Sequence, residues 1–186
     1  MLNEKINNQL MKALILIDVQ NEFSPTGKRP VPDHEKFIAA ITNLVVEARS
    51  ANIPIAWIKH FNKPNKTPAF VPGTWGAELV NGLGPKPESK AESLFEKHVY
   101  GAFTGTPLGA WLDELQITEV QIAGFYTHGC LSTTAREAIM RGLSVTIDPR
   151  TTGACAIENP SLGNQTAAEV SRSALIHLAS MGAEII

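Results

Sequence analysis

Three residues of the sequence carry side chains that could together perform nucleophilic chemistry. Cys130 follows the apolar segment 120–123 after a short turn, and it begins a segment with helical spacing. A thiol at the start of a helix meets free backbone N–H groups and the positive end of the helix dipole, and both favour the thiolate. Asp18 and Lys97 each follow another apolar segment. The carboxylate could take the thiol proton, and the ammonium group could hold the carboxylate and stabilise negative charge beside the sulfur.

Six short apolar segments have the length and composition of β-strands, and four other segments have the spacing of amphipathic helices. The strands are predicted at residues 13–17, 54–58, 93–95, 120–123, 143–148 and 183–186. The helices are predicted at residues 33–50, 107–115, 130–141 and 165–181. This alternation predicts a single α/β domain of Rossmann-like type, with three layers (α/β/α) and a mostly parallel sheet of roughly six strands.

The strand order places the reactive residues at one edge of the predicted sheet. In an open α/β sheet, active sites lie beyond the carboxyl ends of the strands, so Asp18, Lys97 and Cys130 are expected to converge although they are distant in sequence. A loop-rich stretch at residues 60–87, with a short helix expected around residues 75–80, contains five prolines and four glycines. A loop of this length inside a domain is usually functional, so we expect a lid or a substrate wall.

Composition limits the classes of function. The chain has 186 residues, a net charge of −2 and 44% hydrophobic residues, which suits one domain at residues 12–186 after a short extension at residues 1–11. No basic stripe indicates nucleic acid as a partner, and the apolar runs are too short to cross a membrane. No segment has the pattern of a signal peptide, so we expect a cytoplasmic protein. The two cysteines, Cys130 and Cys155, form neither a disulfide framework nor a metal motif, and Cys155 is interpreted as incidental.

Four segments carry a resemblance to a known family. They read LIDVQNEF at 16–23, PGTWGAEL at 72–79, EKHVYGAFTGTPL at 96–108 and GFYTHGCLSTTAREA at 124–138. With these segments in this order, nearly the whole chain from Lys12 onward resembles the isochorismatase-like cysteine hydrolases, which include nicotinamidases and N-carbamoylsarcosine amidase. The resemblance implies that Asp18, Lys97 and Cys130 form the Asp-Lys-Cys triad of that family. It also implies a cis peptide bond between Phe125 and Tyr126.

The resemblance further implies an oxyanion hole and a pocket. The oxyanion hole would consist of the backbone N–H groups of Tyr126 and Cys130. Phe23 occupies a position where the family places an aromatic pocket residue, although it could also be plain core. Trp75 could wall the pocket or be buried at a subunit contact, and His128 could contact the substrate or face solvent. Because relatives are commonly dimers or larger, a homo-oligomer is expected.

The chain departs from two branches of the family. Nicotinamidases carry an Asp-x-His metal motif after the second strand, whereas here no Asp accompanies His60. We therefore expect no metal and no other cofactor, place His60 near the pocket mouth, and disfavour nicotinamidase activity. Isochorismatases proper lack the cysteine nucleophile, so Cys130 argues against vinyl-ether hydrolysis. Two further histidines, His34 and His177, fall on predicted helices and are expected to be exposed.

These residues lead to one main hypothesis and two alternatives. The main hypothesis is a cysteine hydrolase that cleaves a small amide or related C–N bond through a thioester on Cys130, with a small molecule as its partner. An alternative with the same fold is a non-catalytic binding protein or a thiol redox sensor, which would not need Asp18 and Lys97. A nucleotide-binding domain is disfavoured because no strand is followed by a glycine-rich phosphate loop.

Overall fold

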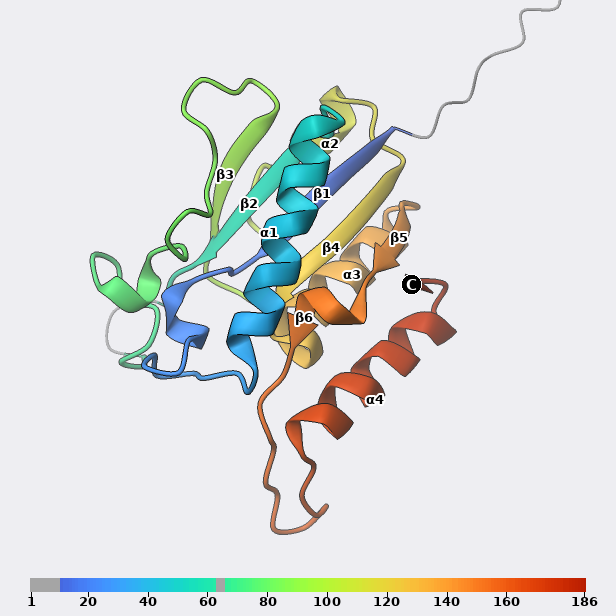
Figure 1. Cartoon of the computed structure of the whole chain (residues 1–186). Coiled ribbons are helices and arrows are strands. Elements are labelled where there is room, and N and C mark those ends of the chain that lie inside the picture. Colours follow the sequence, from blue (N-terminus) through green and yellow to red (C-terminus); the bar gives the residue numbers. More distant parts are fainter. Residues whose placement is uncertain (1–10, 63–65) are drawn as a thin grey trace, which may run out of the picture.

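A parallel sheet forms the middle layer of the molecule (Figure 1). The computed structural model describes residues 11–62 and 66–186, and the expected extension at residues 1–11 lies outside this part except for Met11. Six strands follow the order β3-β2-β1-β4-β5-β7, and the short β6 pairs with β4, which gives seven strands where roughly six were predicted. The strands are β1 (Lys12–Ile17), β2 (Ile55–His60), β3 (Glu92–Lys97), β4 (Glu119–Phe125), β5 (Ser144–Ile147), β6 (Thr152–Gly153) and β7 (Glu184–Ile185).

Helices cover both faces of the sheet, as the α/β/α prediction requires. They are α1 (His34–Ser50), α2 (Leu108–Glu114), α3 (Ser132–Met140) and α4 (Ala167–Ser180). In Figure 1, α1 crosses one face of the sheet, and α2 and α3 lie behind the other face. Short helical turns join these elements: η1 (Asn21–Phe23), η2 (Trp75–Ala77), η3 (Thr127–Leu131) and η4 (Pro149–Thr151). The helix expected around residues 75–80 is therefore a single turn.

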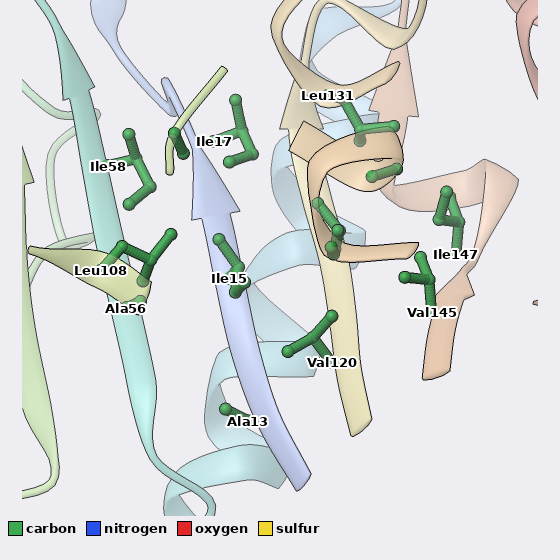
Figure 2. Packing of buried hydrophobic residues seen from close by; sticks show 14 of the residues in the cluster. Ala13, Ile15, Ile17, Ala56, Ile58, Leu108, Val120, Leu131, Val145 and Ile147 are labelled. Atoms are coloured by element: carbon green, nitrogen blue, oxygen red, sulfur yellow. The ribbon is translucent and has the colours of Figure 1, made fainter. Parts of the chain in front are cut away.

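The apolar run of β1 divides between two cores. Ala13, Ile15 and Ile17 belong to the cluster that includes side chains of α2, α3 and α4, and Figure 2 shows them pointing to the same side of the strand. Leu14 and Leu16 belong to the cluster on the α1 side. Successive side chains of a strand point to opposite faces, so a continuous apolar run is what a strand between two helical layers requires.

The helix predicted at residues 33–50 begins one residue later, at His34. Asp33 precedes the helix with φ 56° and makes no side-chain hydrogen bond to its backbone, so it pairs with Lys36 instead of capping the helix. His34, expected to be exposed, is only 6% exposed and stacks on Phe125 at 5.6 Å between ring centroids. His177, in contrast, is exposed on α4, as expected.

Within the described residues 11–62 and 66–186, no helix combines the length and the apolar character that a bilayer crossing needs.

Candidate active site

Four neighbouring strands bring the predicted residues to one edge of the sheet. Asp18 directly follows β1, and His60 and Lys97 are the last residues of β2 and β3, where they are register partners. Cys130 lies in η3, which follows β4 after one residue. Gly124, with φ +116°, allows β4 to approach β1 closely, because a Cβ atom there would lie 1.9 Å from the Ile17 carbonyl oxygen.

A buried ion pair joins the first two strand ends. Lys97 Nζ lies 2.9 Å from Asp18 Oδ2, and the two side chains are 0% and 1% exposed. Lys97 also donates to the carbonyl oxygen of Val99 at 3.2 Å. Burial works against the charge on Lys97, but the Asp18 carboxylate and Cys130 outweigh it and raise the pKa of Lys97. The other oxygen, Asp18 Oδ1, is buried and has no hydrogen-bond partner among the described residues.

His60 lies beside this ion pair, and Asp18, Lys97 and His60 together form what we call the floor of the site. Its Nδ1 lies 3.2 Å from Lys97 Nζ, and its Nε2 lies 3.2 Å from Asn62 Oδ1. Burial and the Lys97 ammonium group lower the pKa of His60, so the neutral ring accepts from Lys97 through Nδ1 and donates to Asn62 through Nε2–H. The side-chain amide of Gln20 holds the His60 backbone with two hydrogen bonds. The expectation that His60 lies near the pocket mouth is thus wrong, because the β2–β3 register places it beside Lys97.

Cys130 lies within reach of the same groups. Its sulfur, a carboxylate oxygen of Asp18 and a ring nitrogen of His60 all lie within 4.8 Å of one another, and Cys130 is 8% exposed. Burial and the Asp18 carboxylate raise the pKa of Cys130, and the nearby Lys97 only partly opposes them. Burial and Asp18 thus oppose the helix-start effect, which by itself favours the thiolate. The α-helix α3 begins at Ser132, directly after η3, and burial is the largest influence on the pKa of the thiol.

A cavity of about 620 Å³ opens over Cys130 and Asp18. The predicted pocket residues Phe23 and His128 both line it. Phe23 also packs in the core on the α1 side, so both interpretations of this residue hold. His128 stacks on Tyr126 at 5.2 Å, its pKa is lowered by burial, and its Nδ1 has no partner among the described residues. The peptide bond between Phe125 and Tyr126 is cis, as the resemblance implied.

Trp75 does not contribute to this cavity. It is 57% exposed and is absent from the described residues that line the cavity. Its backbone carbonyl oxygen instead accepts a hydrogen bond from Asn21 at 3.0 Å. The long loop still supplies one aromatic wall through Phe70, whose ring lies 5.3 Å from that of Phe23.

Three other lining residues had no recognisable signal in the sequence. Cys155, interpreted as incidental, lines the cavity and helps to raise the pKa of Tyr126, where burial is the larger cause. It arrives there because β6, a strand of only two residues, pairs with β4. Arg29 and Lys66 come from two loops that are distant in sequence, and both are exposed. Strand and helix periodicity says nothing about such loop positions, which is why they were missed.

The metal that the nicotinamidase branch implies does not fit this arrangement. A carboxylate, an imidazole and a thiol are suitable ligands for zinc, and those of Asp18, His60 and Cys130 are close enough to share an ion. However, the Lys97 ammonium group already contacts both Asp18 Oδ2 and His60 Nδ1. A divalent ion would compete with this buried cation for the same two donors. The Asp18 and His60 atoms that could bind an ion are therefore already engaged with Lys97.

Comparisons with known proteins agree with this fold. The family model described as the isochorismatase domain matches residues 12–181. A secreted isochorismatase effector of Verticillium dahliae is 33% identical over 135 residues, which cover 73% of this chain and 68% of the effector. A nicotinamidase/pyrazinamidase of Mycobacterium tuberculosis is 30% identical over 158 residues, which cover 74% of this chain and 83% of that protein. The crystal structure of an isochorismatase from Pseudomonas putida KT2440 has a TM-score of 0.84 and 26% identity, covering 94% of this chain and 87% of its own. The chain therefore belongs to the isochorismatase family of hydrolases.

Proposed function

We propose that this protein hydrolyses a small amide or related C–N bond through a thioester on Cys130, with Asp18 and Lys97 as its partners. The observation that carries the proposal is the free oxygen of Asp18. One carboxylate oxygen is held by Lys97 at 2.9 Å, and the other is buried without a partner among the described residues. This second oxygen is the group available to accept the Cys130 proton.

In the first half of the reaction, Asp18 acts as a base. The Cys130 thiol, whose pKa is raised, gives its proton to Asp18 Oδ1 while the sulfur attacks the substrate carbonyl carbon. The C–S bond forms as the carbonyl π-bond becomes an oxyanion. The tetrahedral intermediate then collapses, the C–N bond breaks, and the leaving nitrogen takes the proton from Asp18. The products of this half are an acyl thioester on Cys130 and ammonia or an amine.

In the second half, Asp18 activates water. The carboxylate takes one proton from the water molecule as its oxygen attacks the thioester carbonyl carbon. The C–S bond breaks, the acid leaves, and the sulfur recovers the proton from Asp18. Lys97 stays charged throughout, because its pKa is raised, and it keeps the carboxylate oriented. The neutral His60 accepts a hydrogen bond from Lys97 and so fixes the direction of the ammonium group.

The oxyanion needs donors on the side of the cavity opposite the Asp18 carboxylate. We assign this role to the backbone N–H groups of Tyr126 and Cys130, which both belong to residues that line the cavity. Preorganised donors of this kind typically contribute about 3–4 kcal/mol to the transition state. Phe23 and His128 would bound the rest of the substrate, Phe23 by apolar contact and His128 with its unpartnered Nδ1.

The raised pKa of Cys130 speaks against a redox sensor. Sensor cysteines react as thiolates and are solvent-accessible, whereas Cys130 is 8% exposed and its pKa is raised by burial. A protein that needs its thiol deprotonated only during attack on a carbonyl benefits from a neighbouring base instead. The pairing of Asp18 with Lys97 supplies such a base.

The test is a pair of cysteine variants assayed on a panel of small amides, ureides and carbamoyl compounds. Cys130→Ala is expected to lower turnover by at least about 10³-fold with an unchanged far-UV spectrum, because the nucleophile is lost. Cys155→Ser, which removes the other thiol of the cavity, is the matched control and is expected to retain turnover. Undiminished hydrolysis by Cys130→Ala on a substrate that the wild type accepts would overturn the proposal.

Chelation provides an independent arm of the same assay. Because Lys97 occupies the cation position between Asp18 and His60, activity is expected to be unchanged after dialysis against EDTA. Activity that disappears on chelation and returns with added zinc would contradict the metal-free mechanism.

A further inference from the structure

We propose that the substrate carries an anionic group, such as a carboxylate, distant from its scissile carbonyl, and that Arg29 and Lys66 bind this group at the mouth of the cavity. This inference rests on the proposed function, because it names the class of substrate for the same site. It follows from the charges that line the cavity and from the way in which the two loops are held.

The cavity has an unbalanced charge. Among the described residues that line it, the only acidic one is Asp18, and Lys97 neutralises it through the buried ion pair. Arg29 and Lys66 also line the cavity and are exposed. Within residues 11–62 and 66–186, neither side chain takes part in an ion pair or a hydrogen bond. Two cations at the mouth are therefore uncompensated.

Three histidines also line the cavity: His60, His98 and His128. Burial lowers the pKa of both His60 and His128, so neither adds a positive charge at neutral pH. The Nδ1–H group of His98 donates to the Phe61 carbonyl oxygen at 2.9 Å. The walls between the floor and the mouth are largely aromatic, with Phe23 against Phe70 at 5.3 Å and against Tyr126 at 4.8 Å. Apolar walls limit access of water, and charge interactions inside such a cleft are stronger than at an open surface.

Hydrogen bonds connect the loops that carry Arg29 and Lys66 to each other and to Tyr126 in the cavity wall. Lys28, next to Arg29, donates to the carbonyl oxygen of Pro68, two residues from Lys66. The Tyr126 hydroxyl group donates to the Arg29 carbonyl oxygen at 2.8 Å. The Phe70 N–H donates to the buried side chain of Glu22 at 3.3 Å. These contacts hold the backbone at Arg29 and at residues 68–70, which limits how much the two loops have to rearrange around a ligand.

The charge preference can be measured without any substrate. Iodoacetate and iodoacetamide are alkylating agents of similar size that differ in carrying a carboxylate or a neutral amide. The rate of Cys130 alkylation by each reagent is measured at pH 8 by peptide mass spectrometry, which separates it from Cys155. The ratio of the two rates cancels the intrinsic reactivity of the thiol. The double variant Arg29→Met/Lys66→Met is expected to lower the iodoacetate-to-iodoacetamide ratio about fivefold at low ionic strength.

A matched control removes the same amount of charge elsewhere. Lys86 and Lys90 are exposed and precede β3, so the length of that strand, roughly 20 Å, separates them from the site at its other end. Lys86→Met/Lys90→Met is expected to leave the ratio within a factor of about 1.5, because these charges are screened at that distance. An equal ratio in the wild type and in the Arg29/Lys66 double variant overturns the proposal, and so does an equal fall in both double variants.

Turnover gives the second readout and separates this inference from the proposed function. Succinamate and its methyl ester present the same amide with and without a carboxylate. The wild type is expected to favour succinamate in kcat/KM, and the Arg29/Lys66 double variant to lose that preference mainly through KM. If the neutral ester is the better substrate, the proposed function stands and the charge inference fails. If neither is hydrolysed, the alkylation ratio alone decides the charge inference, and the substrate panel with Cys130→Ala decides the proposed function.

Discussion

The floor and the mouth of the cavity treat charge in opposite ways. On the floor, Lys97 and Asp18 are almost completely buried and pair with each other at 2.9 Å, and the neutral His60 accepts from Lys97. At the mouth, Arg29 and Lys66 are exposed and have no acidic partner among the described residues. A buried charge needs a partner because an unpaired one lowers the free energy of unfolding by several kcal/mol, about 3–5 in typical cases. An exposed charge is solvated by water and stays available to bind a ligand.

This contrast separates two tasks. A closed network of buried groups can hold one carboxylate oxygen and leave the other free, which is what proton transfer at Cys130 requires. Solvent-exposed cations contribute little to the free energy of unfolding, but they can select a ligand by its charge. Changes on the floor should therefore affect folding and turnover together. Changes at the mouth should affect the choice of substrate alone.

The largest effect is expected from breaking the buried pair. Lys97→Met leaves Asp18 buried without its cation, and removing one partner of such a pair typically costs about 3–5 kcal/mol in the free energy of unfolding. Turnover should fall at least about 100-fold, because the base loses its orientation. Urea unfolding and steady-state kinetics measure both quantities. The comparison variant Arg29→Met should unfold within about 0.5 kcal/mol of the wild type, and an equal loss of stability in both variants would break the distinction between floor and mouth.

A smaller effect on the floor is expected from His60. His60→Phe removes the acceptor for Lys97 Nζ, and a hydrogen bond to a charged group is worth about 1.5–3 kcal/mol, so kcat should fall roughly 10- to 100-fold with little change in KM. His60→Asn offers an amide oxygen near the position of Nδ1 and should recover part of the loss. A rise in KM without a change in kcat would instead place His60 in direct contact with the substrate.

Acidification should weaken the fold through the buried histidines. Burial lowers the pKa of His34, His60 and His128 below the ordinary histidine value of 6.5. The unfolded chain therefore takes up protons that the native state resists as the pH falls through about 6.5, and the free energy of unfolding decreases between pH 7.5 and pH 5.5. Urea midpoints at the two pH values measure this slope.

Single histidine variants test the origin of that slope. His34→Gln should reduce it, because His34 is buried against Phe125 with Nε2 unpartnered among the described residues. His177→Gln, at an exposed position of α4, should leave it unchanged. The same reduction in both variants would mean that burial is not the cause.

The residues on the floor were predictable because the rules of parallel sheets determine where they lie. Asp18, Lys97 and Cys130 each follow a strand that the apolar runs identify, and neighbouring parallel strands bring their carboxyl ends together. The depth of His60 was not predictable, because it depends on its register with Lys97 in β3. The raised pKa of Cys130 was also missed, because the helix-start argument considers only local dipoles and omits burial and Asp18.

The residues of the mouth could not be derived from sequence patterns. Arg29, Lys66 and Cys155 lie in segments whose course is set by individual hydrogen bonds, such as that from Lys28 to the Pro68 carbonyl oxygen. Such contacts leave no periodic pattern in the sequence. The fold class was predictable for the opposite reason: the alternation of apolar strands and amphipathic helices repeats along the whole chain.

Trp75 provides the smallest expected effect and tests where the mouth ends. The side chain is 57% exposed and lies outside the set of described residues that line the cavity, so Trp75→Ala should change kcat/KM less than about twofold and the free energy of unfolding by less than about 0.5 kcal/mol. Phe70→Ala, in the same long loop but inside the cavity, is the paired variant, and its loss of packing against Phe23 should raise KM. Because both residues belong to one loop, a general loosening of that loop would affect both variants alike. If Trp75→Ala lowers kcat/KM in an oligomeric form of the protein but not in its monomer, the tryptophan would instead belong to a subunit contact beside the mouth. Such a contact is the second role expected for Trp75 from its position in the loop.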